Sequence, residues 1–88
     1  MSIQATLHPF LNDGKELQLE VSGNTVGECL KEIVRQYPAM EKKMFDKKGR
    51  IKGYVEVLVN DHGIGADELA YVVKDGDSMT IIVYLSGG

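Results

Sequence analysis

The 88-residue sequence has no tryptophan, only two prolines and a single cysteine. One cysteine cannot close an internal disulfide, and it cannot by itself hold an iron–sulfur cluster or a structural zinc ion. A lone thiol is compatible with a reducing cytosol, so we expect a cytoplasmic protein. Cys29 falls on or beside a predicted apolar helix stripe, which favours a buried core residue over a reactive thiol.

Long apolar runs are also missing. No apolar stretch approaches the ~20 residues that a membrane-spanning helix needs. The segment Met1-Ser2-Ile3-Gln4-Ala5 has neither the basic start nor the apolar run of a signal peptide. The net charge of −3 disfavours bulk nucleic-acid binding, which needs a basic face. We therefore expect neither a membrane nor a nucleic-acid partner.

The motifs of common catalytic sites are absent as well. The sequence contains neither GxxxxGK[ST] nor GxGxxG, and His8 and His62 are far apart with no metal-ligand spacing. Asp75 and Asp77 could be paired carboxylates, but their position around Gly76 is more typical of a turn. We expect no catalytic residue, no metal site and no bound cofactor. The protein is not expected to be an enzyme.

One local feature departs from the acidic balance of the chain. A run of basic residues crosses the middle of the sequence: Lys42, Lys43, Lys47, Lys48, Arg50 and Lys52. Most such runs are solvated surfaces, and this is the favoured interpretation. Contact with a phosphate or with an acidic partner is the less favoured alternative.

Hydrophobic periodicity predicts short strands around one main helix. Alternating apolar residues predict strands over 3–7 and 17–21, which Asn12-Asp13-Gly14 would join as a hairpin. Thr25 and Glu28 have the spacing of a capping box, and the apolar stripe that follows predicts a helix ending before Pro38. A shorter helix is expected over 39–45.

The second half of the chain predicts two further strands. Val55, Val57 and Val59 alternate with other residues in a clear strand pattern, and 60–63 is expected to be a turn. Residues 64–73 leave a helical turn near 67–69 and a short edge strand as options. The last strand is predicted over 79–85.

This order of elements predicts an α+β fold. A hairpin, a crossover helix and returning strands give a mixed sheet of four to five strands with one main helix across one face. We interpret this as the β-grasp, or ubiquitin-like, arrangement. Residues 1–85 would form this single domain, and residues 86–88 would form a flexible tail.

The tail Ser86-Gly87-Gly88 directly follows the last predicted strand. Two glycines without Cβ atoms let an extended backbone enter a cleft too narrow for other residues. At about 3.3 Å per residue, three residues reach roughly 10 Å beyond the sheet. The reactive group would then be the main-chain carboxylate of Gly88, which accounts for the lack of catalytic side chains.

Several segments together resemble the MoaD/ThiS family of small, ubiquitin-like sulfur-carrier proteins. They are Thr25-Val26-Gly27-Glu28 followed by Leu30, Val57-Leu58-Val59-Asn60-Asp61, Asp75-Gly76-Asp77-Ser78-Met79-Thr80-Ile81, and Gly87-Gly88. Each motif is short, and the resemblance depends on their order and spacing over nearly the whole chain. The length of the 44–51 stretch is more similar to molybdopterin-type or cysteine-synthesis carriers than to the shortest thiamine-type carriers.

The resemblance implies a specific route of sulfur transfer. An ATP-dependent adenylating enzyme, similar to ubiquitin-activating (E1-like) enzymes, would adenylate Gly88. A sulfur donor would convert the adenylate to a thiocarboxylate, with Gly87 and Ser86 threading the tail into the partner. A sulfur-accepting synthase would use the sulfur in cysteine, molybdopterin or thiamine biosynthesis. The carrier itself would bind no cofactor, and ATP would be used by the activating enzyme.

Strand alternation also predicts a docking surface. If Val57 and Ile81 face the helix, then Leu58, Ile82 and Tyr84 face outward as an apolar patch near the tail. The alternative is that a loop near 66–69 covers this face. Two other functions stay open: a ubiquitin-like modifier conjugated to proteins through Gly88, and a non-catalytic interaction domain in which the two glycines have no role.

Overall fold

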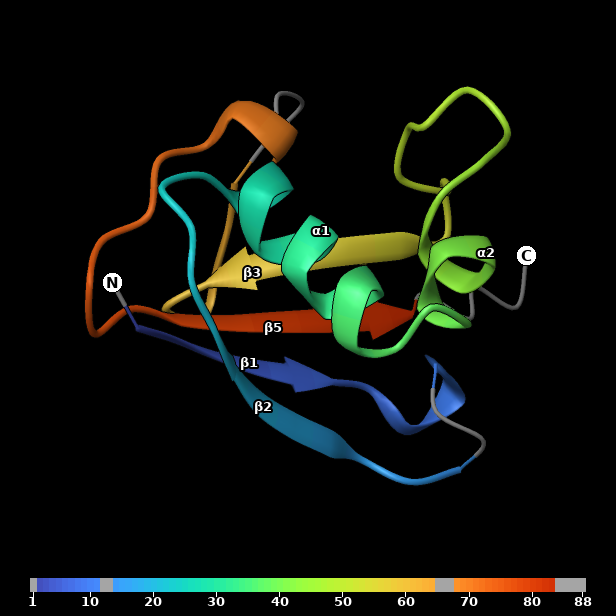
Figure 1. Ribbon diagram of the computed structural model, residues 1–88, viewed down its shortest axis with the longest axis horizontal. Helices are drawn as coiled ribbons and strands as arrows, with labels where there is room; N and C mark the ends of the chain where they lie inside the picture. The colour runs from blue at the N-terminus through green and yellow to red at the C-terminus, as the bar shows by residue number, and fades with distance from the viewer. Residues whose placement is uncertain (1, 12–13, 65–67, 84–88) are drawn as a thin grey trace.

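A mixed β-sheet forms the centre of the protein in the computed structural model, which describes residues 2–11, 14–64 and 68–83. Within these residues the sheet has five strands in the order β2-β1-β5-β3-β4 (Figure 1). The strands are β1 (Ile3–Leu7), β2 (Leu17–Val21), β3 (Val55–Val59), β4 (His62–Gly63) and β5 (Ser78–Val83). One main helix lies across one face, so the predicted β-grasp, ubiquitin-like α+β fold is confirmed.

The predicted N-terminal hairpin is present. β1 pairs with β2 in antiparallel register from Ile3↔Val21 to Leu7↔Leu17. A short 3₁₀ helix, η1 (Pro9–Leu11), interrupts the connection, and Gly14 takes φ +87°, a conformation that glycine adopts without strain. Two residues of the predicted turn, 12 and 13, lie outside the described residues.

The main helix, α1 (Val26–Gln36), begins and ends where the sequence predicts. The Glu28 N–H donates to Thr25 Oγ1 at 3.2 Å, and the Glu28 carboxylate accepts the N–H of Asn24 at 2.8 Å. This is a capping box displaced by one residue, because the returned hydrogen bond reaches Asn24 instead of Thr25. At the other end the Tyr37 N–H donates to Ile33, directly before Pro38.

The core lies between α1 and the sheet. Its fully buried side chains include those of Val26, Cys29 and Ile33 from the helix and Val57 and Ile81 from the strands. Burial raises the pKa of the Cys29 thiol, and the nearby Glu28 carboxylate raises it further. The prediction that Cys29 is a core residue is confirmed.

A second helix and a long loop follow α1. Helix α2 (Met40–Met44) lies within the predicted range, and its two methionines are buried. The Asp46 carboxylate then accepts the N–H groups of Lys48 and Arg50 at 2.8 and 3.0 Å, which closes the loop that leads back to the sheet.

The structure corrects the prediction for residues 60–63. Only Asn60 and Asp61 turn the chain, with φ of 51° and 68°, and His62–Gly63 is a strand, β4, that pairs with the end of β3. The prediction of a four-residue turn was wrong because such a short strand is defined by its partner. A helical turn, η2 (Glu68–Ala70), follows as expected.

The short edge strand proposed within 64–73 is absent from the described residues of that range, 64 and 68–73. Val72 instead forms an isolated antiparallel bridge with Thr25, outside the main sheet. The last predicted strand is β5, which runs from Ser78 to Val83; residues 84 and 85 lie outside the described residues. None of the helices in the described ranges is long and apolar enough to cross a membrane.

Candidate functional site

β5 is the middle strand of the sheet, and ladders hold both of its edges. It pairs in parallel with β1 up to Leu7↔Ile81 and antiparallel with β3 up to Val55↔Val83. The His8 N–H extends the first ladder with a 2.8 Å hydrogen bond to the Ile81 carbonyl. β5 is therefore held on both sides as far as Ile81, and β3 continues to pair with it as far as Val83. The predicted tail residues Ser86, Gly87 and Gly88 lie outside the described residues.

Two of the three predicted docking residues are placed on one face of the sheet. Val57 and Ile81 are fully buried under α1, so the alternating residues Leu58 and Ile82 point to the opposite face, where both are half-buried. The register places Glu56 opposite Ile82 and Thr80 opposite Leu58, so the two apolar residues are diagonal neighbours. Tyr84, the third, lies outside the described residues.

In the alternative interpretation, a loop near 66–69 covers this face of the sheet. The described part of that loop, η2, packs against α1. A Cβ atom added at Gly27 would lie 2.9 Å from the Leu69 carbonyl oxygen, so η2 contacts the start of that helix. Burial raises the pKa of Glu68, and the negative charge of the Glu56 carboxylate raises it further.

A hydrogen-bond cluster joins the turn after β3 to the start of β5. The Asn60 side-chain oxygen accepts the backbone N–H of Ser78 at 3.0 Å, and the side-chain amide donates to the Asp77 carboxylate at 3.1 Å. The backbone N–H of Asn60 donates to the Ser78 carbonyl at 2.8 Å. The Asp77 carboxylate also accepts the Lys74 N–H at 2.8 Å. The Asn60 amide, and then that backbone N–H, hold the pKa of Asp77 below its ordinary value.

Asp75 and Asp77 belong to a turn, as predicted. Gly76 takes φ +90°, and its N–H donates to the Ser2 carbonyl at 2.9 Å. Asp75 accepts the Ser2 N–H at 2.6 Å. Both carboxylates therefore hold backbone groups in place. Within the described residues, moreover, no group of three or more histidine, cysteine or acidic side chains is arranged to hold a metal ion.

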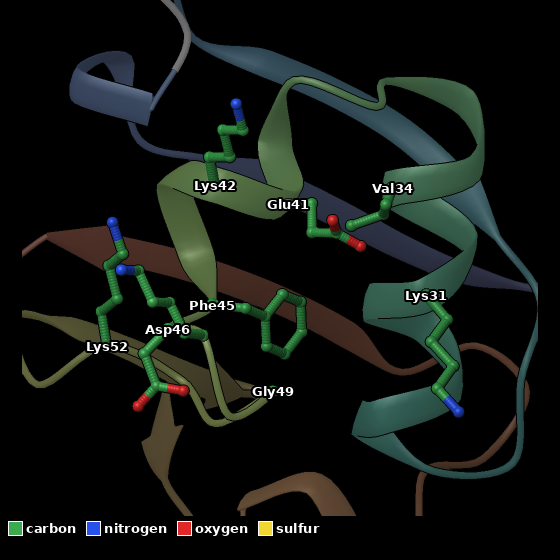
Figure 2. A pocket seen from close by; sticks show the side chains of 9 residues that line it. Lys31, Val34, Glu41, Lys42, Phe45, Asp46, Gly49 and Lys52 are labelled. Atoms are coloured by element: carbon green, nitrogen blue, oxygen red, sulfur yellow. The ribbon is translucent and has the colours of Figure 1, made fainter.

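The structure also contains a pocket that no sequence motif predicts. An open pocket of about 830 Å³ lies between α1, α2 and the loop that follows α2, and part of the basic run lines it (Figure 2). Lys31 and Val34 of α1 complete its wall. The basic run was the available signal, but the contribution of α1 depends on tertiary packing.

Comparison with known proteins now defines the family. The ThiS family model matches residues 1–88, the full length of the sequence. The chain belongs to the ThiS family. This assignment confirms the resemblance to the MoaD/ThiS family. Members of the family are small non-catalytic proteins, as expected for this chain.

Relatives of this ThiS-family chain include carriers and modifiers. The sulfur carrier protein CysO of Mycobacterium tuberculosis is 29% identical over 91 residues, covering 100% of this chain and 96% of CysO. Small archaeal modifier protein 1 of Haloferax volcanii is 29% identical over 75 residues, covering 84% of this chain and 83% of that protein.

Solved structures of relatives share the fold over nearly the whole chain. The crystal structure of the Haloferax volcanii modifier, SAMP1, matches with a TM-score of 0.79 at 25% identity, covering 100% of both chains. A chain in the BexX/CysO complex of Amycolatopsis orientalis matches with a TM-score of 0.80 at 23% identity, covering 98% of this chain and 99% of that one.

Proposed function

We propose that this chain is a sulfur carrier that works through the carboxylate of Gly88. An E1-like enzyme adenylates this carboxylate with ATP and releases pyrophosphate. Sulfide then attacks the acyl carbon: a C–S bond forms, the C–O bond to AMP breaks, and AMP leaves with its electron pair. The product is a thiocarboxylate at Gly88, ready for transfer to an acceptor.

The chemistry explains why the carrier needs an activating enzyme. A carboxylate is a poor electrophile, and adenylation gives its carbon a good leaving group. The thiocarboxylate sulfur is then the nucleophile toward the substrate of a synthase, and hydrolysis of the resulting acyl–sulfur bond restores the Gly88 carboxylate. The catalytic groups belong to the partner enzymes, which position the tail.

The observation that carries the proposal is membership of the ThiS family over residues 1–88, which include Gly87 and Gly88. The name of the CysO relative, a sulfur carrier protein, supports it. Pairing of β5 on both edges supports it further, because a fixed strand can direct the chain that follows into a partner. We propose that Ser86 and Gly87 thread through the partner's narrow cleft.

We propose that Leu58, Ile82 and Tyr84 form the surface on which the partners dock. Leu58 and Ile82 offer adjacent apolar area on the open face, and a docked partner would remove it from water. In related folds, CysO of Amycolatopsis orientalis forms a complex with BexX, and a molybdopterin-converting factor of Helicobacter pylori is a complex of its subunits 1 and 2.

Mass spectrometry of the intact chain tests the proposal. After incubation with ATP, sulfide and a ThiS-family activating enzyme, the chain should gain the mass difference between a sulfur and an oxygen atom. A variant lacking Gly88 should gain nothing. Failure of the native chain with the activating enzyme from its own source would contradict the proposal.

Acceptor enzymes would then identify the pathway. The thiocarboxylated chain can be offered separately to synthases that form cysteine, molybdopterin and the thiazole of thiamine. We expect one synthase to consume the thiocarboxylate, which would return the chain to its original mass.

Protein modification is a second candidate function, favoured by the 29% identity to small archaeal modifier protein 1. In that case a lysine amine of a target would attack the adenylated Gly88 and form an isopeptide bond. Affinity-tagged chain should then be recovered from its own cells attached to target proteins. Digestion of these conjugates should give branched peptides in which Gly88 is joined to a target lysine. Their absence, together with thiocarboxylate formation, would leave sulfur transfer as the function.

A further inference from the structure

The pocket between α1, α2 and the following loop has an apolar floor. Figure 2 shows the Phe45 ring near its centre, directed toward α1, with the Val34 and Glu41 side chains above the ring in this view. Both residues are half-buried and pack against the core, so each keeps part of its apolar surface open to the pocket. An apolar side chain from a ligand could cover this floor and remove it from water.

The rim of the same pocket is basic. Lys31, Lys42, Lys47 and Lys52 line it together with two carboxylates, those of Glu41 and Asp46. The pocket therefore carries two excess positive charges in a chain whose net charge is −3. Figure 2 shows lysines on different sides of the Phe45 ring, with Lys31 on α1 and Lys52 on the opposite loop.

Existing contacts compensate the Asp46 carboxylate, whereas Glu41 and three of the four lining lysines form no ion pair within the described residues. Asp46 accepts two backbone N–H groups and lies 3.7 Å from the Arg50 side chain, so its charge is compensated inside its own loop. Lys52 stacks over the Tyr54 ring at 5.7 Å. Lys31, Lys42 and Lys47 form no ion pair with any carboxylate of the described residues. Glu41 is thus the one lining carboxylate without such compensation in the described part of the chain.

We propose that this pocket binds a peptide segment of a partner protein in which acidic residues flank an apolar side chain. The apolar side chain would pack on Phe45 and Val34, and the acidic residues would pair with Lys31, Lys42 and Lys47. A small inorganic anion would leave the apolar floor uncovered, and an uncharged apolar ligand would leave the lysines unpaired. Both halves of the pocket match only a ligand that combines the two properties.

This site goes beyond the proposed function and is independent of it. The pocket lies against the helices, whereas the proposed docking residues Leu58 and Ile82 lie on the opposite face of the sheet. A partner could therefore occupy the pocket whether or not Gly88 carries sulfur. Binding can accordingly be measured with the unmodified chain.

Titration of the full ¹⁵N-labelled chain with a short synthetic peptide tests the proposal. The peptide carries Leu-Ile-Leu between two runs of aspartate; one control replaces aspartate with lysine, and another replaces Leu-Ile-Leu with serine. We expect amide shifts at Val34 and Phe45 and their neighbours with the first peptide. Both controls should bind at least about tenfold more weakly, and raising NaCl from about 0.05 to 0.5 M should weaken the binding.

Two charge variants test the role of the basic rim, because they should change the affinity for the peptide in opposite directions. Lys42→Glu should weaken binding about fivefold, and Glu41→Lys should strengthen it by a similar factor, as expected for exposed charge pairs. Both side chains are exposed, so the fold should tolerate the changes. The matched controls are Lys15→Glu and Glu16→Lys, which make the same changes at exposed positions that do not line the pocket.

Three outcomes would overturn the proposal. The first is no binding of the acidic–apolar peptide at low salt. The second is equal binding of the serine control, which would reduce the site to nonspecific charge attraction. The third is an equal response of the pocket variants and their matched controls.

Discussion

At the scale of single residues, Asn60 connects two of the sequence motifs in the folded chain. It adopts φ 51°, a left-handed conformation that asparagine tolerates better than most residues. Its side chain bonds to Asp77 and to Ser78 at the start of β5. The motif that ends in Asn60-Asp61 and the motif that begins at Asp75 are therefore hydrogen-bonded to each other in the folded chain.

Asn60 contributes a left-handed backbone conformation and side-chain hydrogen bonds, and two substitutions distinguish these contributions. Asn60→Gly keeps the left-handed backbone but loses the side-chain hydrogen bonds, which should cost about 1 kcal/mol of unfolding free energy. Asn60→Ala loses both and should cost about 2 kcal/mol. Urea unfolding followed by circular dichroism would measure the order; equal stability of the two variants would show that backbone conformation has no part in it.

Gly27 is a second residue whose substitution has a definite sign. Alanine usually stabilises a helix relative to glycine by about 1 kcal/mol. Here the new Cβ would lie 2.9 Å from the Leu69 carbonyl oxygen, which is backbone and cannot rotate away. Gly27→Ala should therefore destabilise the protein by about 1–2 kcal/mol. Gly53→Ala, which meets no atom within 4 Å, is the control and should be nearly neutral. A stabilised Gly27→Ala variant would mean that η2 does not pack closely on α1.

At the scale of elements, the parts of the fold that depend on local signals are predictable from the sequence. Thr25 and Glu28 cap α1, and the alternation of β3 separates buried from outward-facing residues. β4 could not be predicted, because the two residues His62–Gly63 are too few to show an alternating apolar pattern. They form a strand because they pair with β3. The pocket could not be predicted for a similar reason: only tertiary packing brings Lys31 of α1 opposite the loop after α2. Local chemistry specifies the elements, and contacts between elements create the surfaces.

The turn that enters β5 should make stability depend on pH. The pKa of Asp77 is held below its ordinary value of 3.8 by Asn60 and by the Lys74 N–H. A carboxylate with a lowered folded-state pKa stabilises the fold above its unfolded pKa, and this contribution disappears as pH falls through the folded value. Asp77→Asn should thus be less stable than the native chain at neutral pH, and the difference should shrink below about pH 3.8.

Urea midpoints measured from neutral to acidic pH check this prediction. Asp61→Asn is a suitable control, because it removes an exposed carboxylate from the neighbouring turn and asparagine also tolerates φ 68°. The control should follow the native chain over the whole range. A constant difference between Asp77→Asn and the native chain down to acidic pH would show that the Asp77 carboxylate charge does not matter.

At the scale of the whole molecule, the two faces of the sheet differ in how much they contribute to the core. One face, which includes the fully buried Val57 and Ile81, packs under α1 and forms the core. The other face carries Leu58 and Ile82, which are half-buried and contribute less to that core. A domain of this design can change its outer face without losing its fold, and this predicts that docking variants fail in transfer before they fail in folding.

Leu58→Asp tests this separation in the sulfur-loading reaction. The charge should raise the KM of the activating enzyme for the carrier at least about tenfold, because a desolvated apolar contact is replaced by a carboxylate. It should leave kcat and the cooperative urea transition of the carrier nearly unchanged. Gln18→Asp adds a charge to an exposed residue of the edge strand β2 on the same face and should leave the KM nearly unchanged. Leu58→Ser provides a check without charge if the aspartate variant unfolds. An unchanged KM for a folded Leu58 variant would place the docking surface elsewhere on the protein.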